Sequence, residues 1–403
     1  MRLRVIALGL ILIPFVDVLP FLDHIGGHMR SVRMEVATVF ALILGLLSFR
    51  KPTQCHNKYV LAFLSLIPLT MFYARRVPVL VGNIIQTSPW VGSAVLTILV
   101  FFLMFIAVSN VKVSRNDFVA LCNIFSVCGF VASLFCICHY FGFAQFFFLD
   151  THAAAVNQTA GRVIGHLGHA TLTAPFIGMC LPISLCRKHY KMAIVMAIGI
   201  LLTKSQVGIG AAIAGVLAYY STKGYRQAGV IMIVSFLSLL VLSSGFFGND
   251  KMRNFIGDSG RFQTWKNAVS DIKDGLTEQI TPRPLTGYGP GSFRVFYHLK
   301  HPIGKVGESR QMLKAHNEYL EILYAMGIFG LIAFLMAMYE CLKNVIPVCR
   351  YRHLGGVIGA FVSISVAAGG TFVWQLGATG FYSCVLFGLL NNESVLILSS
   401  KMA

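Results

Sequence analysis

The stretch Ala315-His316-Asn317-Glu318-Tyr319-Leu320-Glu321-Ile322-Leu323 closes a long polar segment and leads into the apolar run 324–338. Upstream, the same segment contains Ser259-Gly260-Arg261-Phe262-Gln263-Thr264-Trp265 and Gly287-Tyr288-Gly289-Pro290-Gly291-Ser292-Phe293. Elsewhere the chain consists mostly of hydrophobic runs of helical length. The segment between residues 259 and 331 is therefore where we expect a water-exposed active site.

The composition is that of an integral membrane protein. Of 403 residues, 56% are hydrophobic and 12% are charged, and the mean hydropathy is +0.73, whereas soluble domains carry roughly 25% charged residues. The net charge of +18 would suggest nucleic acid in a soluble protein. In a membrane protein it indicates positive-inside topology and an anionic substrate, and we expect no nucleic-acid partner. Most of the ten cysteines lie in apolar runs, so no disulfide framework is expected.

The apolar runs predict an all-α, polytopic membrane protein with about 12 transmembrane helices. A hydrocarbon core about 30 Å thick requires roughly 20 apolar residues per helix. The predicted spans are 5–22, 35–49, 59–73, 90–109, 118–143, 171–186, 192–203, 206–220, 227–247, 317–339, 354–374 and 377–398. Only Lys204 and Ser205 separate the seventh and eighth spans, so residues 192–220 form either two helices or one broken helix.

The distribution of Lys and Arg predicts the topology. With the N-terminus inside, the inner segments hold 16 of these residues and the short outer loops hold 6, which is the bias expected of cytoplasmic loops. Residues 248–316 then form one large outer loop domain between helices 9 and 10. The predicted division is 1–247 for the first nine helices, 248–316 for the loop domain and 317–403 for the last three helices.

Three other patterns have a structural interpretation. The small residues of the eighth span, from Gly208 to Gly215, allow close helix packing. Residues 253–273 read as a surface helix whose aromatic residues and Val269 cover a membrane or protein face. His152, His166 and His169 could form a metal site on a helix, but Gly165 and Gly168 favour a loop with hydrogen-bonding or incidental histidines.

Together, the three quoted stretches resemble the family of bacterial O-antigen ligases and O-antigen polymerases. The resemblance also rests on residues 326–331, Met-Gly-Ile-Phe-Gly-Leu, and on Gly161-Arg162 with Gly165. It implies a membrane glycosyltransferase of the bacterial inner membrane with about a dozen spans and one large periplasmic loop. Such an enzyme transfers a glycan from undecaprenyl diphosphate on the periplasmic side, without a metal or other cofactor. His316 matches the family's essential histidine, and Arg162 and Arg261 match the arginines thought to hold the donor diphosphate.

The implied roles agree with the chemistry of these side chains. A sugar hydroxyl is a poor nucleophile, and a histidine with a reference pKa of about 6.5 can accept its proton near neutral pH. Guanidinium groups bind phosphate oxygens bidentately and can replace a divalent ion on a leaving diphosphate. The alternatives are a helix-end role for His316 and snorkelling toward lipid headgroups for Arg162 and Arg261.

Two acceptors are compatible with this chemistry. A ligase uses the lipid A core oligosaccharide and a polymerase uses another lipid-linked repeat unit; the compact chain and the His-Asn-Glu-Tyr stretch favour the ligase. A transporter or flippase of lipid-linked oligosaccharide would also have many spans. Transporters commonly carry paired broken helices and midplane charges, whereas the His and Arg candidates here gather on one predicted side.

Overall fold

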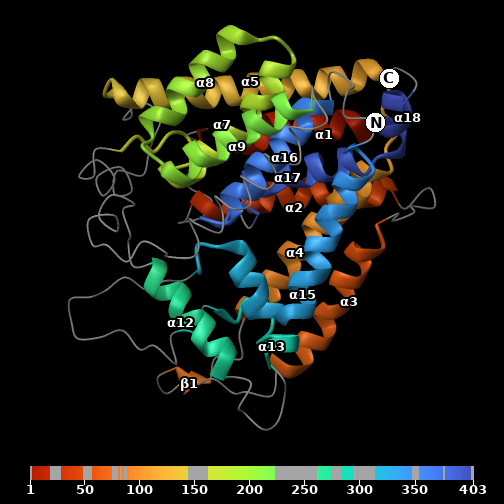
Figure 1. Cartoon of the computed structure of the whole chain (residues 1–403), viewed down its shortest axis with the longest axis vertical. Coiled ribbons are helices and arrows are strands. Elements are labelled where there is room, and N and C mark those ends of the chain that lie inside the picture. Colours follow the sequence, from red (N-terminus) through yellow and green to blue (C-terminus); the bar gives the residue numbers. More distant parts are fainter. Residues whose placement is uncertain are drawn as a thin grey trace.

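Helices form nearly all of the described regular structure (Figure 1). The computed structural model describes residues 2–18, 29–48, 57–74, 80–81, 84–85, 89–143, 162–222, 261–274, 283–293, 297, 314–346, 354–374 and 377–400. Apart from helices, these residues contain two short strands, β1 (Leu80–Val81) and β2 (Ile84–Ile85), paired antiparallel. The all-helical prediction is confirmed. The cysteines within the described residues are free, as expected.

Every predicted span that falls on described residues overlaps a helix. The helices are α1 (Arg2–Leu12), η1 (Ile13–Val18), α2 (Met29–Ser48), α3 (Lys58–Ala74), α4 (Pro89–Ser109), α5 (Arg115–Tyr140), α7 (Ala170–Cys186), α8 (Tyr190–Leu202), α9 (Gln206–Ser221), α12 (Arg261–Asp274), α13 (Arg283–Thr286), α15 (Glu318–Lys343), α16 (Leu354–Ala368), α17 (Gly377–Leu390) and α18 (Glu393–Ser400). The ninth predicted span, 227–247, lies outside the described residues. The division into three parts and the twelve membrane crossings stay predictions.

Two predicted spans are not continuous helices. The helix predicted over 354–374 stops at Ala368. Residues 369–374, which begin with Gly369 and Gly370, are not helical. The last span is divided into α17 and α18 at Asn392. The Asn392 side-chain amide donates to the carbonyl oxygens of Val108 (2.7 Å) and Val111 (2.9 Å), so it fixes the break against the end of α4. Hydropathy alone does not detect such polar interruptions.

Residues 192–220 form two helices. The left-handed backbone of Lys204, with φ of +50°, separates α8 from α9, and the Ser205 hydroxyl accepts a hydrogen bond from the backbone N–H of Gly208 as the N-cap of α9. The two helices then pack on different partners: α8 lies mainly on α5 and α7, and α9 lies mainly on α7 and α16.

Small residues join α7, α9 and α16, as predicted for the eighth span. A Cβ added at Gly208 would lie 2.2 Å from the Ala174 Cβ of α7. One added at Gly215 would lie 2.7 Å from the Gly359 carbonyl oxygen of α16, and the reverse substitution at Gly359 would meet the Gly215 oxygen at 2.6 Å. The three helix backbones therefore approach too closely for larger side chains.

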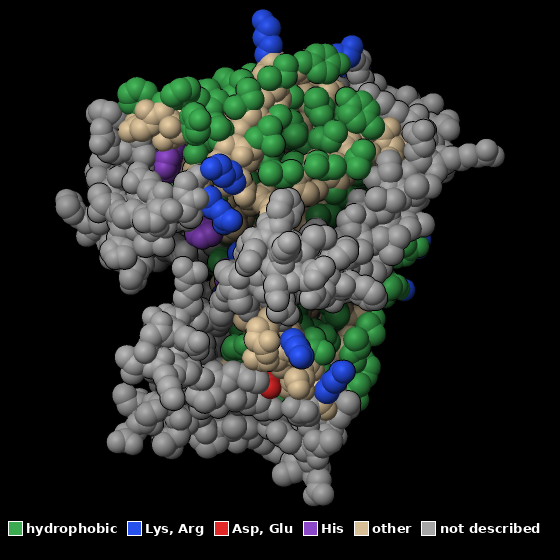
Figure 2. All heavy atoms as spheres, turned by 60° about the vertical axis from the view of Figure 1, so that its left-hand side comes forward, with side chains coloured by type: hydrophobic (Ala, Val, Ile, Leu, Met, Phe, Trp, Pro, Cys, Tyr) green, Lys and Arg blue, Asp and Glu red, His purple; other side chains and the backbone are tan. Residues whose placement is uncertain are grey.

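The outer surfaces of several helices are apolar. On α8, Ile194 and Leu201 are each 61% exposed, and on α15 Phe329 and Ile332 are each 50% exposed. Figure 2 shows hydrophobic side chains spread over the upper part of one face. Two described helices, α5 and α15, are long and apolar enough to cross a membrane, and several shorter apolar helices accompany them. Surfaces of this kind are unusual in soluble monomers and fit a membrane protein.

Helix α15 is interrupted at Gly327. This residue has φ of +66° and ψ of −172°, so helical geometry stops there and resumes afterwards. The carbonyl oxygens just before the break accept hydrogen bonds from the glycine-rich turn: Tyr288 N donates to Tyr324 O (3.0 Å) and Gly289 N donates to Ala325 O (2.7 Å). The glycine-rich stretch thus meets, backbone to backbone, the part of α15 that directly follows the 315–323 stretch, which confirms a turn with close approach at residues 287–291.

The N-terminal part of α15 packs with the segment before it. Ala268 of α12, Tyr288, Phe293, Leu320 and Tyr324 belong to one buried hydrophobic cluster. In Figure 1, α12 and α13 lie below the main helix bundle. The first two turns of α15 and the loop residues therefore form one packed unit that carries the motifs.

The buried face of α12 differs from the predicted one at Val269. Val269 is 41% exposed, whereas Thr264, Ala268 and Asp271 are buried. The helix presents these residues, together with Trp265, to the loop 287–293 and to α15. Residues 253–260 lie outside the described part of the chain. The predicted helix is confirmed over α12, and Trp265 packs on the buried cluster as its pattern suggested. Val269 does not, because tertiary packing selected a buried stripe that leaves it outside.

Candidate functional site

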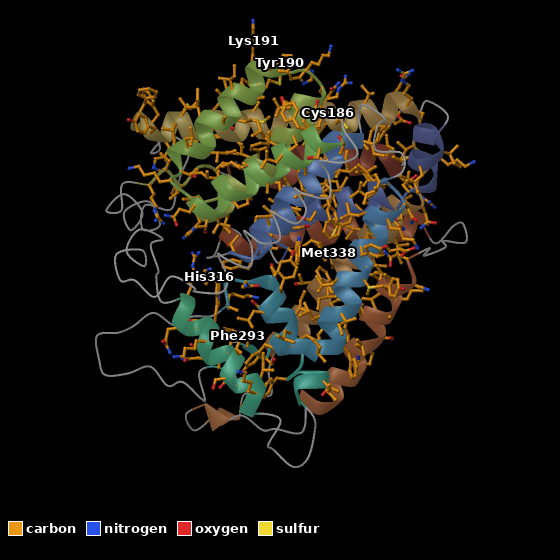
Figure 3. The ribbon with its side chains drawn as sticks, in the orientation of Figure 1. Cys186, Tyr190, Lys191, Phe293, His316 and Met338 are labelled. Atoms are coloured by element: carbon orange, nitrogen blue, oxygen red, sulfur yellow. The ribbon has the colours of Figure 1, made fainter. Side chains whose placement is uncertain are left out.

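His316 lies at the start of α15 in an unusual backbone conformation. Its φ is +52°, in the left-handed region that few non-glycine residues adopt. Both neighbours are buried and fixed: the Ala315 carbonyl accepts a 2.6 Å hydrogen bond from Trp265 Nε1, and the Asn317 side chain caps α15 by accepting from Leu320 N at 3.1 Å. A strained residue held between fixed neighbours is typical of functional sites. Figure 3 places His316 near the upper end of α12, at the bundle.

Arg261 is the first residue of α12. Its Nη1 donates a hydrogen bond to the Gly370 carbonyl oxygen at 3.2 Å. Trp265, which holds the backbone beside His316, follows one helical turn later and therefore lies on the same side of α12. One short helix thus positions both the guanidinium group and the chain that carries the histidine.

The segment 369–374 brings His316 and Arg261 together. Its Gly370 carbonyl contacts Arg261, and its Phe372 ring lies 4.9 Å from the His316 ring, measured between centroids. His316 and Arg261 are therefore neighbours of one short stretch that follows α16. The sequence motifs suggested His316 and Arg261 as site residues, but they did not suggest that segment 369–374 contacts both.

The end of this segment is fastened to α15. The buried Glu318 side chain accepts a 2.9 Å hydrogen bond from the Trp374 backbone N–H through Oε1. The Trp374 ring also packs on Tyr319 and Phe334 of α15, at centroid distances of 5.5 and 4.9 Å. The residues that follow His316 thus hold the segment that lies against it.

Arg162 lies just before a tight turn on α7. The carbonyl oxygen of Ile164 accepts a 2.6 Å hydrogen bond from the Thr173 hydroxyl. Gly165 has φ of +63°, and a Cβ there would lie 2.5 Å from Thr173 Cγ2. The predicted loop at Gly165 and Gly168 is confirmed, and the Arg162 backbone is held close to the first turn of α7.

Helix contacts relate the Arg162 loop to the other two candidates. The first turn of α7 meets α9 where Ala174 touches Gly208, and the neighbouring Val207 of α9 lies against Gly370. The loop of Arg162 and the segment that contacts Arg261 are thus at the same end of the bundle. The Arg162 side chain is partly exposed, and its role in substrate binding stays a prediction.

The histidines of the earlier loop have other surroundings. His166 is 2% exposed and its ring stacks on Phe15 at 5.0 Å. His169 is the N-cap of α7, where Nδ1 accepts from Thr171 N at 3.2 Å. His152 lies outside the described residues. His166 and His169 thus serve packing and helix capping, respectively.

The acidic side chains near the site also have defined contacts. Glu321 Oε1 forms an ion pair with Lys314 Nζ at 3.1 Å, and Asp271 Oδ2 accepts from the Tyr324 hydroxyl at 3.4 Å. Glu318 accepts from a backbone N–H, as described above. Within the described ranges, no three His, Cys, Asp or Glu side chains are grouped as metal ligands.

Several contributors to the site were not predicted. Glu318 stands inside the quoted His-Asn-Glu stretch, so a signal was present, but its contact with Trp374 depends on the tertiary structure. Gly370 and Phe372 had no signal, because hydropathy placed them inside a membrane span. Trp265 was recognised in its motif, but its hydrogen bond beside His316 was not foreseen.

The fold and site define a class: a helical membrane protein with a histidine and arginines gathered at one end of its bundle. Residues 192–335, which include Arg261 and His316, match the family described as O-Antigen ligase. This match supports the assignment to the O-antigen ligase family, and the resemblance drawn from the motifs is confirmed. Family members are glycosyltransferase-like membrane enzymes of lipopolysaccharide biosynthesis, with lipid-linked glycans as substrates. A comparison with curated proteins finds no match.

Proposed function

We propose that this protein is an O-antigen ligase, which transfers O-antigen glycan from undecaprenyl diphosphate to lipid A core oligosaccharide at the periplasmic face of the inner membrane. The observation that carries the proposal is the placement of His316 and Arg261 against one segment, 369–374, at a single end of the bundle. A base and a phosphate-binding cation are the two groups that this transfer requires.

In the proposed reaction, His316 takes the proton of an acceptor hydroxyl while the hydroxyl oxygen forms a bond to the anomeric carbon. The bond from that carbon to the diphosphate breaks, and its electron pair leaves with the diphosphate oxygen. Arg261 and Arg162 bind this oxygen and its neighbours, whose charge increases as the bond breaks. A single displacement of this kind inverts the configuration at the anomeric carbon.

The assay that tests the function uses purified protein in detergent or nanodiscs with undecaprenyl-diphosphate-linked glycan. One reaction contains lipid A core oligosaccharide and a second contains only additional donor. Glycan attached to the core supports the ligase, whereas elongation of the donor would identify an O-antigen polymerase. No covalent product in either reaction, with movement of the donor across a vesicle membrane, would identify a transporter instead.

Arg261→Lys should lower donor-dependent turnover by about tenfold or more, because an ammonium group cannot reproduce a bidentate guanidinium contact with phosphate. Arg162→Lys should act in the same direction. The control is Arg115→Lys, which changes an exposed residue at the start of α5 and should leave turnover unchanged. Wild-type turnover in the Arg261 variant, at equal protein level, would show that Arg261 supplies only charge or packing.

Transfer should continue when divalent ions are removed. This follows from the proposal that arginines, rather than a metal held by carboxylates, neutralise the leaving diphosphate. The measurement compares initial rates with EDTA, without EDTA, and with EDTA plus excess magnesium or manganese. A rate that disappears with EDTA and returns with either ion would contradict the metal-independent mechanism.

A further inference from the structure

We propose that Glu318 is a positioning residue that holds the segment 369–374 in contact with both His316 and Arg261. The inference rests on the proposed transfer reaction. It assigns a role to a carboxylate that neither the family match nor the proposed chemistry uses. The contacts that support it come from three motif residues and converge on one short stretch outside the matched range 192–335.

The convergence has a regular spacing. Arg261 contacts Gly370, His316 contacts Phe372 and Glu318 contacts Trp374, so every second residue of the segment is engaged. Residues 371–373 have no helical or strand structure, and two hydrogen bonds join them to the neighbouring helices: Thr371 N donates to Ala367 O at 3.0 Å, and the Thr379 hydroxyl donates to the Val373 carbonyl oxygen. The contacts with the three motif residues are what places the segment against His316 and Arg261, in addition to its hydrogen bonds to α16 and α17.

Glu318 is well suited to hold the segment. Its side chain is 2% exposed, and a buried carboxylate is retained only where hydrogen bonds or charges compensate for its lost hydration. It is the first residue of α15, where the helix dipole favours a negative charge. The hydrogen bond from Trp374 N to Glu318 Oε1 is charge-assisted, which makes it one of the stronger contacts of the segment.

The position of Glu318 in the chain links its hydrogen bond with Trp374 to the His316 imidazole. Glu318 follows His316 by two residues, and Asn317 between them caps the same helix end. The turn that presents His316 and the anchor of the segment are therefore parts of one rigid unit. Losing the anchor should let Phe372 move from the imidazole ring and Gly370 move from the guanidinium group. Small displacements of this kind can lower the rate of an enzyme by up to about 10²-fold.

The test compares Glu318→Ala with Glu318→Gln. Glutamine keeps an oxygen acceptor at the same distance along the side chain, so it can still accept from Trp374 N, whereas alanine cannot. We expect Glu318→Ala to lower kcat for glycan transfer by about 10- to 100-fold. Glu318→Gln should remain within about threefold of the wild type, because it keeps the hydrogen bond in a neutral form. The control is Glu340→Ala, the same change near the other end of α15, where Glu340 pairs only with Lys343 at the helix surface.

A second measurement does not depend on activity. Hydrogen–deuterium exchange of the peptide covering residues 369–374 reports directly on the Trp374 N–H and its neighbours. Exchange there should be faster in Glu318→Ala than in the wild type, and close to wild type in Glu318→Gln and Glu340→Ala. Exchange in α7 and α9 should be the same in all four proteins, which shows that the fold is retained.

Turnover and hydrogen–deuterium exchange together distinguish a failure of the proposed function from a failure of the positioning role. If wild-type protein transfers no glycan, the proposed function fails, and exchange alone then decides whether Glu318 anchors the segment. If the wild type is active and Glu318→Ala keeps its turnover or its slow exchange, the positioning role is wrong. Equal loss of turnover in Glu318→Gln and Glu318→Ala would also overturn it, because the negative charge rather than the hydrogen bond to the segment would then be what matters.

Discussion

His316→Ala should lower the turnover of glycan transfer by about 10² or more while the lipid-linked donor still binds. A general base acts in the transition state and typically contributes a factor of about 10² to 10⁴ to the rate. In the proposed mechanism the arginines hold the diphosphate in the ground state, so removing the imidazole should change kcat far more than the donor KM. The measurements are steady-state kinetics with varied donor, and donor binding to the variant.

The pH dependence of the same reaction provides a second check on His316. A base must be unprotonated to accept a proton, so wild-type turnover should fall as the pH drops below the ordinary histidine range near 6.5. Any residual turnover of the His316→Ala variant should not show this fall at low pH. Product analysis should show inversion at the anomeric carbon. Full turnover in the variant, or retained configuration in the product, would make His316 a helix-end residue without a catalytic role.

The left-handed backbone of His316 calls for a conservative companion variant. His316→Asn keeps a residue type that tolerates positive φ better than alanine does, and it lacks a group that titrates near neutral pH. Loss of turnover in both variants, with unchanged thermal unfolding, would assign the effect to the missing imidazole. An active Asn variant would show that the backbone turn, rather than the side chain, is what the site requires.

Gly327→Ala should prevent assembly of the site by destabilising the fold around it. The backbone of Gly327, with φ of +66° and ψ of −172°, lies in a region that essentially only glycine occupies. An added Cβ would lie 2.3 Å from both the carbonyl carbon and oxygen of Leu285, which are main-chain atoms that cannot rotate away. Strain of about 1–3 kcal/mol from the backbone is therefore increased by a steric clash. We expect a large fall in the yield of folded protein and in its thermal unfolding midpoint.

A matched control, Gly142→Ala, separates backbone strain from the steric clash. Gly142 also has positive φ, at +86°, but a Cβ there would find no heavy atom within 4 Å. Gly142→Ala should show only the conformational cost of a left-handed residue, about 1–2 kcal/mol. Gly287→Ala should behave like Gly327→Ala, because its Cβ would lie 2.4 Å from the carbonyl carbon of Ala325. The measurements are size-exclusion profiles and thermal unfolding in detergent. Equal stability of Gly327→Ala and Gly142→Ala would show that the two backbones can separate without cost.

The sequence by itself determined the class of fold and the chemistry-bearing residues. Long apolar runs can hide their backbone polar groups in hydrocarbon only as helices, so composition and hydropathy predict the helical architecture. The small residues of the eighth span predicted close packing because side-chain volume limits how closely two helices approach. The motifs around His316 and Arg261 resembled those of a family that the match over residues 192–335 supports, and the roles proposed for the two residues stay predictions.

The tertiary structure alone decided how these residues meet. Hydropathy averages over many residues, so it did not detect the non-helical segment 369–374 or the break at Gly327. The contacts of Arg261 with Gly370 and of Glu318 with Trp374 join positions 109 and 56 residues apart, and no local pattern encodes such distances. Backbone carbonyls, which look alike in every sequence, form the partners in several of these contacts. Residue types therefore suggested the candidate residues, and long-range packing set their geometry.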